Sequence, residues 1–286
     1  MTTLSPSEQV AAIEGRARRI ETPCGDGAMV WRIWGGDRGD AAPLVLGHGA
    51  QGAWSHWIRN VAALGESRMV LAVDLPGHGD SALPATHDHE GIVAALAEGL
   101  AAIVGERPVD LAGFSFSGTC FAHLAAWHPE RARRLILIGT GGLDTPHGPI
   151  DLRRVSGLEG EAREAAIRAN ILGLMIQHAE TVDDLAMHLH MANARAARLK
   201  NAAQLVLPDR LKRVLPQVRA QVDAIWGAHD RPHPVEERQE DVLRALVPEL
   251  DFRVIADAGH WAMYERPDMF NAALLDMLGQ PLRAAG

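Results

Sequence analysis

A serine flanked by small residues lies in the stretch DLAGFSFSGTC, residues 110–120. Gly113 precedes Ser115 by two positions and Ser117 follows it by two, a spacing typical of a sharp turn that presents a nucleophile between a strand and a helix. The flanking residues must be small there because the two backbones approach closely. Glycine is usual at the second small position, and here Gly118 comes one residue later. The same stretch is also compatible with a serine that merely caps a helix.

A serine hydroxyl becomes a useful nucleophile only when a base takes its proton and a carboxylate orients that base. His260, in VIADAGHWAMYERP (254–267), directly follows the last predicted strand, and Asp230, in AIWGAHDRPHP (224–234), follows the strand before it. Each of them alone could be an ordinary loop residue. The chain order Ser115, Asp230, His260, with each residue at the carboxyl end of a predicted strand, favours a catalytic triad.

The glycine-rich stretch LVLGHGAQG (44–52) can be interpreted in two ways. It matches G-x-G-x-x-G, and Asp74 ends the next strand, RMVLAVD (68–74), as in a dinucleotide-binding site. Alternatively, the turn supplies an oxyanion hole from the backbone N–H groups of Ala50 and Phe116. We favour the oxyanion hole, because dinucleotide binding leaves the serine, aspartate and histidine without a role. Binding of a dinucleotide remains the runner-up hypothesis.

Short apolar segments alternate with helical ones over most of the chain. The pattern predicts an antiparallel pair at 18–23 and 29–36, strands at 43–47, 68–74, 108–114, 133–140, 221–227 and 250–259, and helices at 54–65, 88–105 and 116–128. Between about 150 and 213 it predicts helices only, in particular over 159–177 and 181–205. The expected fold class is therefore α/β, with a mostly parallel sheet, helices on both faces and an inserted all-helical segment.

Five motifs together resemble the α/β-hydrolase superfamily: GHG, DLPGHGDS, GFSFSG, WGAHD and GHWAMYERP. The resemblance implies a core built from residues 18–142 and 215–286, with residues 143–214 in the position of that family's cap. It also implies a serine hydrolase that needs no cofactor.

Two further stretches, GHWAMYERPDMFN (259–271) and WSHWIRN (54–60), resemble the meta-cleavage-product hydrolases, which cut carbon–carbon bonds in vinylogous keto acids. In that subfamily a cap arginine and the tryptophan after the base bind the keto-acid end of the substrate. The resemblance implies these roles for Arg195 and Trp261, with Arg198 as the other candidate arginine. The sequence departs from the subfamily at Phe114, where a polar residue is usual, and after the serine, where Met-Gly-Gly is usual.

The substrate is expected to be small and partly apolar and to lie between the cap and the core. Phe114, Met175 and Met191 are predicted to line its pocket, although core packing is the more common reason for methionines at helical spacing. The chain has 14 histidines, but none forms a three-ligand set with zinc-like spacing, so no metal site is predicted.

Composition narrows the remaining function classes. A formal net charge of −8 disfavours nucleic acid and anionic membranes as partners. Two widely separated cysteines and the lack of a signal-peptide pattern favour a reducing, cytoplasmic location. The expected partner is a small-molecule substrate, and the sequence leaves open whether the chain forms a homo-oligomer. Besides carbon–carbon bond hydrolysis, the alternatives are a carboxylesterase or lactonase, and a ligand receptor that retains the fold and the triad.

Overall fold

A computed structural model describes residues 4–39, 41–235 and 238–283. Within these residues the strands form one eight-stranded sheet, in the order β1-β2-β4-β3-β5-β6-β7-β8. Strands β1 and β2 are antiparallel to each other, β2 is antiparallel to β4, and the remaining pairs are parallel. The strands are β1 (Arg18–Cys24), β2 (Gly27–Trp34), β3 (Leu44–Gly47), β4 (Val70–Val73), β5 (Val109–Phe114), β6 (Ala132–Ile138), β7 (Gln221–Gly227) and β8 (Phe252–Ile255). The predicted α/β class with a mostly parallel sheet is confirmed.

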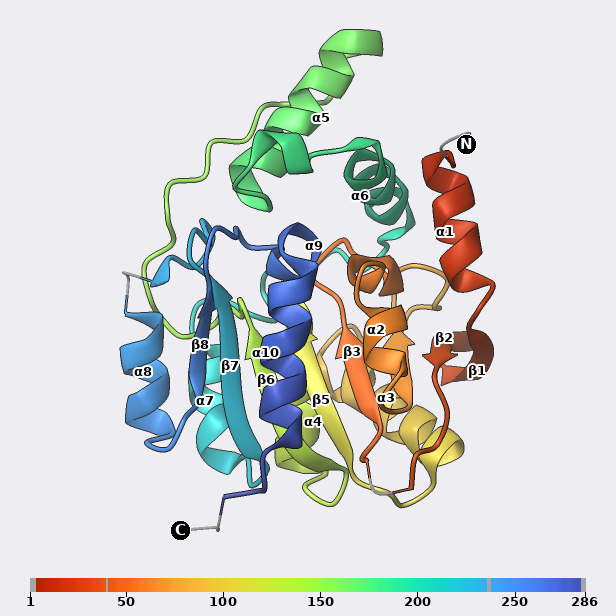
Figure 1. The fold of residues 1–286 in the computed structure, drawn as a ribbon, viewed down its shortest axis with the longest axis vertical. Helices are drawn as coiled ribbons and strands as arrows, with labels where there is room; N and C mark the ends of the chain where they lie inside the picture. Colours follow the sequence, from red (N-terminus) through yellow and green to blue (C-terminus); the bar gives the residue numbers. More distant parts are fainter. Residues whose placement is uncertain (1–3, 40, 236–237, 284–286) are drawn as a thin grey trace.

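Helices cover both faces of the sheet, as Figure 1 shows. The α-helices are α1 (Pro6–Glu14), α2 (Val61–Gly65), α3 (His89–Val104), α4 (Phe116–Trp127), α5 (Gly160–Leu174), α6 (Asp184–Ala196), α7 (Arg210–Val214), α8 (Gln239–Leu246), α9 (Ala262–Glu265) and α10 (Pro267–Gly279). Short 3₁₀ helices are η1 (Trp54–Trp57), η2 (Ala179–Thr181) and η3 (Leu215–Gln217).

The hydrophobic core consists of one apolar cluster on each face of the sheet. In β5, Leu111 packs into the cluster that includes residues of α3 and α4, whereas Ala112 and Phe114 pack into the cluster that includes residues of α2 and α10. Every residue of β3, β4 and β5 is buried. Burial on both faces explains why β3 and β4 are continuous apolar runs instead of alternating patterns, and why the one charged residue of β5, Asp110, is paired with Arg68 and Arg133.

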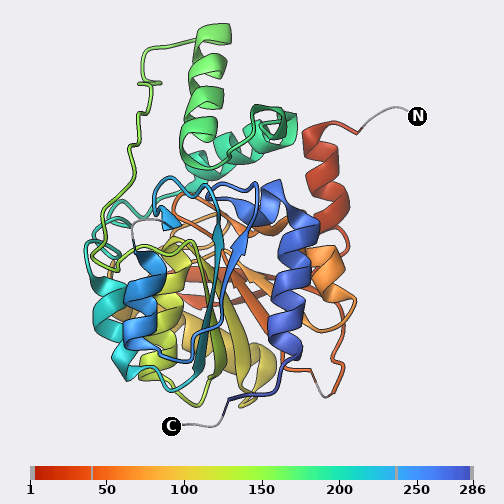
Figure 2. The ribbon, with the colours of Figure 1, turned by 60° about the vertical axis from the view of Figure 1, so that its left-hand side comes forward.

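The chain between β6 and β7 carries α5, α6 and α7, and we call residues 143–214 the helical insertion. Helices α5 and α6 lie above the sheet, at the end where its parallel strands finish (Figures 1 and 2). The first predicted helix, 159–177, is confirmed as α5 with a shorter C-terminal end. The boundaries of the insertion as a separate domain stay a prediction.

Two predicted helices differ from those in the structure: one is shorter and the other is divided. Helix α6 ends at Ala196 instead of continuing to 205, because the backbone N–H groups of Arg198 and Leu199 donate to the Gly77 carbonyl at 2.7 and 3.3 Å instead of to their own helix. The predicted helix over 54–65 is divided into η1 and α2. Tertiary hydrogen bonds of this kind are invisible to a periodicity analysis.

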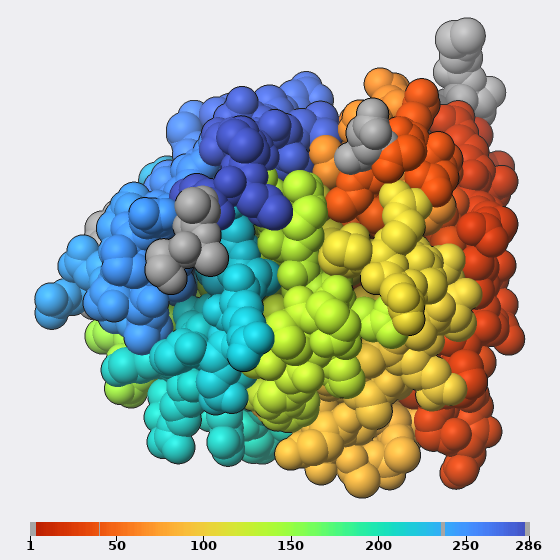
Figure 3. All heavy atoms as spheres, turned by 90° about the horizontal axis from the view of Figure 1, so that it is seen from below, coloured from red at the N-terminus to blue at the C-terminus, as the bar shows by residue number. Residues whose placement is uncertain are grey.

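Viewed from the end opposite the insertion, the first half of the chain (red to yellow-green) lies against the second half (teal to blue) (Figure 3). Among the described residues, no helix combines the length and the apolar character that crossing a membrane requires.

Candidate active site

Ser115 occupies the turn between β5 and α4 in a conformation that L-residues rarely adopt. Its φ is +51°, and it is the residue immediately before the first residue of α4. The Ser115 N–H donates to the Ile138 carbonyl of β6 at 2.8 Å, and the Gly118 N–H donates to the Ser115 carbonyl at 3.1 Å. Strain of this kind persists only where surrounding contacts fix it, and it is concentrated at functional sites.

The small residues around Ser115 are required by close backbone approach. A Cβ on Gly113 would lie 2.6 Å from the Cα of Gly118, and a Cβ on Gly118 would lie 2.1 Å from the Thr140 Oγ1. Ser117 is accommodated because its hydroxyl donates to the Phe114 carbonyl at 3.0 Å and because Gly47, which faces it, has no side chain. The predicted sharp turn is therefore present, with Ser117 at the position where glycine is usual.

The strained φ of Ser115 leads to a stability prediction. Ser115→Ala keeps the Cβ and its strain, whereas Ser115→Gly removes both, so we expect the glycine variant to be more stable than the alanine variant by about 1 kcal/mol. Urea unfolding of the two variants measures the difference. An alanine variant as stable as the glycine variant would show that the turn stores no strain.

Asp230 and His260 form a buried hydrogen-bonded pair. The His260 Nδ1–H donates to Asp230 Oδ2 at 2.8 Å, and the Asp230 Oδ1 accepts from the His233 N–H at 2.9 Å. The two side chains are 0% and 5% exposed. Since Nδ1 carries the hydrogen, Nε2 is left free to accept a proton.

The end of β6 joins this pair to the serine turn. A Cβ on Gly139 would lie 2.7 Å from Asp230 Oδ2 and 3.0 Å from His260 Nδ1. Gly139 follows Ile138, whose carbonyl accepts from the Ser115 N–H. The Phe114 ring, immediately before Ser115, lies 4.8 Å from the His260 ring between centroids. The fold therefore brings all three predicted residues to one place.

Three other histidines near the serine turn are buried and not suited to act as its base. Burial lowers the pKa of His48 to about 4 and that of His78 to about 3, and it lowers the pKa of His56 well below its ordinary value. The His48 Nε2 already accepts from the Leu75 N–H at 3.0 Å. Among these rings only that of His260 is hydrogen-bonded to a carboxylate.

A cavity of about 200 Å³ opens at Ser115. It is lined by Ala50, Ser115, Phe116, His147, Ile150, Ala202, Ala203, Val206, Leu207, Pro232 and His233. The glycine-rich turn closely approaches the serine, since a Cβ on Gly49 would lie 3.4 Å from the Ser115 Cβ. Phe116 begins α4, so its N–H has no acceptor within the helix. The arrangement can present the Ala50 and Phe116 amides to a developing oxyanion.

Asp74, the acidic residue of the dinucleotide pattern, is buried and fully engaged by the protein. Its Oδ1 accepts from the Trp54 N–H at 2.7 Å, and its Oδ2 accepts from the Arg32 guanidinium at 2.8 Å and the Asp80 N–H at 3.1 Å. A ribose hydroxyl would have to displace these bonds. The glycine pattern therefore belongs to a turn beside the serine, and Asp74 has a structural role.

The alpha/beta hydrolase family model matches residues 44–273, a span that contains the serine turn and the aspartate–histidine pair. The chain belongs to the alpha/beta hydrolase family. It is 30% identical over 256 residues to a 2-hydroxy-6-oxononadienedioate/2-hydroxy-6-oxononatrienedioate hydrolase of Paraburkholderia phymatum, covering 83% of this chain and 87% of that protein. The expected enzyme class and the resemblance to meta-cleavage-product hydrolases are thereby confirmed at the level of the family.

Solved structures with this fold include esterases and a lactonase. The enol-lactonase of Burkholderia xenovorans has a TM-score of 0.70 at 21% identity, over 91% of this chain and 100% of that one. An esterase from a Rhodococcus species has a TM-score of 0.72 at 21% identity, over 94% and 99%. These similarities show that the fold is shared.

This alpha/beta hydrolase does not place the predicted substrate-binding arginine at the serine. Arg195 is exposed on α6 and is absent from the lining of the Ser115 cavity. Arg198 also has an exposed side chain, and its guanidinium donates to the Ser81 carbonyl. Neither arginine lines the cavity at Ser115.

The other predicted substrate-binding residues, Trp261, Phe114 and Met191, are not part of the lining of the Ser115 cavity. Trp261 is buried, donates from Nε1 to the His56 carbonyl at 2.9 Å and stacks on Tyr264 at 4.2 Å between centroids. Met191 is 39% exposed and lines a separate groove between α5 and α6. Phe114 lies under the site against His260.

Met175 is half-buried, and its carbonyl accepts from the Trp261 N–H at 2.7 Å. It therefore supports the histidine loop through its backbone rather than lining the Ser115 cavity.

Several residues that line the Ser115 cavity were not predicted from the sequence. They include Pro232 and His233, and from the insertion His147, Ala202, Ala203, Val206 and Leu207. His233 could have been found from its position three residues after Asp230, where its N–H caps the carboxylate. In the described part of the chain, no group of three or more histidine, cysteine, aspartate or glutamate side chains is arranged to hold a metal ion.

Proposed function

We propose that Ser115, His260 and Asp230 are the catalytic triad of a serine hydrolase that acts on a small carbonyl compound. The observation that carries the proposal is the 2.8 Å hydrogen bond from the His260 Nδ1 to the buried Asp230, next to a serine held at positive φ. The family match supports the same class of chemistry.

In the proposed reaction, the His260 Nε2 takes the Ser115 hydroxyl proton as the oxygen attacks the substrate carbonyl carbon. Asp230 stabilises the imidazolium that forms. The Ala50 and Phe116 N–H groups bind the negative oxygen of the tetrahedral intermediate. The intermediate collapses to an acyl-enzyme as His260 gives its proton to the leaving group. Water then attacks the acyl-enzyme with His260 again acting as the base, which releases an acid and regenerates the serine.

We propose that the scissile bond is an ester or lactone of an uncharged substrate. The Ser115 cavity is lined mainly by apolar residues, and its described lining contains no lysine or arginine to neutralise a substrate carboxylate. Leaving a carboxylate unpaired in such a cavity would be costly. Its volume of about 200 Å³ suits a small acyl group.

A second candidate reaction is hydrolysis of the carbon–carbon bond of a vinylogous keto acid. The observation that favours it is the similarity to curated relatives from Paraburkholderia phymatum and Burkholderia cepacia that are named as hydrolases of 2-hydroxy-6-oxo acids. Trp261, directly after the base, is part of the same resemblance. A cytoplasmic location and a small-molecule partner remain predictions for either reaction.

A substrate panel tests the two candidates against each other. It compares p-nitrophenyl acetate, butyrate and octanoate, a small lactone and a coloured ring-fission dienoate, with Ser115→Ala as the blank for each. We expect turnover of the short neutral esters or the lactone, and kcat/KM at least about tenfold lower for the dienoate. A preference for the dienoate would reject the ester proposal in favour of carbon–carbon bond hydrolysis.

Replacing Arg195 with glutamine provides a more selective test. Because the Arg195 side chain is exposed and outside the Ser115 cavity, we expect kcat/KM to change by less than about twofold on esters and dienoate alike. Arg198→Gln tests the other candidate arginine in the same assay. A loss of about 30-fold or more on the dienoate alone, the size expected for a buried charge-assisted hydrogen bond, would show that α6 closes over a keto acid.

A further inference from the structure

Glu265, the last residue of α9, has a buried carboxylate that is bonded to backbone N–H groups on two separate segments. Its Oε2 accepts from the Gly259 N–H at 2.7 Å, on the loop that carries His260. Its Oε1 accepts from the His178 N–H at 2.7 Å, and both oxygens lie 3.0 Å from the Gln177 N. Glu265 is 4% exposed. One carboxylate thus connects the histidine loop to the helical insertion.

A second hydrogen bond and a close contact tie the same two segments together. The Trp261 N–H donates to the Met175 carbonyl at 2.7 Å. A Cβ on Gly259 would lie 2.9 Å from the Gln177 N and 3.0 Å from the Met175 oxygen. The residues on both sides of His260 are therefore held against residues 175–178, which join α5 to η2.

The negative charge of Glu265 is balanced here by N–H dipoles. No arginine or lysine in the described ranges forms an ion pair with its carboxylate, and all the donors to it are backbone amides. Charge-assisted hydrogen bonds of this type are about twice as strong as neutral ones. An amide side chain in its place would keep one acceptor oxygen and turn an NH₂ group toward N–H donors that it cannot satisfy.

We propose that Glu265 is a positioning residue for His260, acting through the backbone of Gly259 and by fixing residues 175–178 of the insertion against the histidine loop. The inference rests on the proposed triad. In this proposal, residues 175–178 of the insertion help to hold the His260 imidazole in the orientation that faces Asp230 and Ser115. Glu265 itself lies outside the Ser115 cavity and does not line it.

The variant that tests the proposal is Glu265→Gln, which preserves the side-chain shape. We expect kcat on the best ester to fall by about 10- to 100-fold with KM changed less than about threefold, because a small displacement of a catalytic group lowers the rate without removing substrate contacts. In proton NMR spectra we expect the low-field signal of the His260 Nδ1–H to broaden or disappear. This signal reports the bond to Asp230 directly and does not depend on a substrate.

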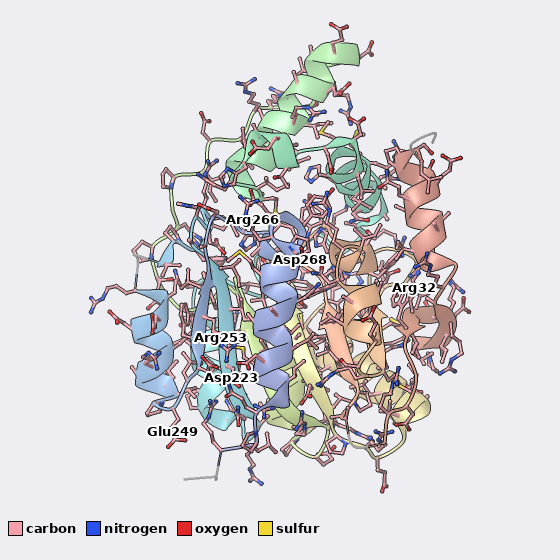
Figure 4. All side chains as sticks on the ribbon, viewed as in Figure 1. Arg32, Asp223, Glu249, Arg253, Arg266 and Asp268 are labelled. Carbon is pink, nitrogen blue, oxygen red and sulfur yellow. The ribbon has the colours of Figure 1, made fainter. Side chains whose placement is uncertain are left out.

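Asp223→Asn is the matched control for lost stability. Asp223 is also a buried carboxylate bonded to a backbone N–H, that of Asp251 at 3.2 Å, although unlike Glu265 it is also paired with Arg134 and Arg283. It lies toward the lower end of the sheet, whereas Arg266, the neighbour of Glu265, lies at the upper end beside the insertion (Figure 4). We expect Asp223→Asn to unfold at lower urea concentration than the unmodified protein but to keep its kcat within about twofold and its low-field signal.

The proposal is overturned if Glu265→Gln retains both kcat within twofold and the low-field signal, or if Asp223→Asn loses kcat to the same extent. Should Glu265→Gln not fold, Glu265→Asp carries the test, because it keeps the charge on a shorter side chain. For Glu265→Asp, a smaller loss of kcat together with a weakened His260 Nδ1–H signal supports the proposal. An unchanged kcat and an unchanged signal reject it. Failure of the triad itself is distinguishable, because Ser115→Ala would then retain turnover whatever Glu265 does.

Discussion

Ser115→Ala is expected to lower kcat on the best ester by a factor of about 10⁴ or more, the range measured when the nucleophile of other serine triads is removed. The variant keeps the Cβ, the backbone hydrogen bond from the Ser115 N–H to Ile138 and the conformation of the turn. Loss of rate can therefore be attributed to the missing hydroxyl. Steady-state kinetics with p-nitrophenyl esters measure it.

Ser117→Ala is the control for the serine, because the Ser117 hydroxyl is buried and donates to the Phe114 carbonyl at 3.0 Å. It should lower stability by about 1 kcal/mol and leave kcat within a few-fold. If Ser115→Ala keeps turnover near that of the unmodified protein while Ser117→Ala abolishes it, the nucleophile has been assigned to the wrong serine.

Asp230→Asn is expected to reduce kcat by about 10⁴, as asparagine does in another serine triad, with little effect on KM. The asparagine would leave the imidazole without a negative partner and could favour the wrong tautomer. The His233 N–H can still donate to the remaining carbonyl oxygen, so the loop should keep its conformation. The kcat and KM values on the best ester measure the loss of activity, and near-ultraviolet circular dichroism checks that the folded structure is unchanged.

Asp257→Asn is the matched control for the aspartate. Asp257 lies in the same region, between β8 and His260, but it is exposed and has a φ of +52°, which asparagine tolerates well. Its replacement should change kcat by less than about twofold. A larger effect at Asp257 than at Asp230 would require the triad to be redrawn.

Much of the fold could be predicted from the sequence because the parallel strands are buried on both faces. Strand β7 spans the predicted residues 221–227, and β5 lies within one residue of its prediction. The serine turn could be predicted because close approach restricts Gly113 and Gly118 to small residues. Each of these signals is local in the sequence.

The substrate-binding residues could not be predicted in the same way, because they depend on how the insertion packs. Helix α6 ends at Ala196 through bonds to the Gly77 carbonyl, and this redirects the chain that follows it. Ala202 and Ala203, which line the Ser115 cavity, fall within the predicted helix 181–205, but the structure has turns there instead. The role of Glu265 could not be predicted for a related reason, since its two partners in the insertion, Gln177 and His178, lie more than 80 residues away in the sequence.

The most direct test of the proposed triad is covalent labelling with a fluorophosphonate, followed by mass spectrometry of the intact protein and of its peptides. We expect one adduct per chain, located on Ser115, absent in Ser115→Ala and formed much more slowly in Asp230→Asn. Ser117→Ala and Asp257→Asn should be labelled at the rate of the unmodified protein. An adduct on another residue, or no adduct on the folded protein, would contradict the assignment of Ser115 as the nucleophile.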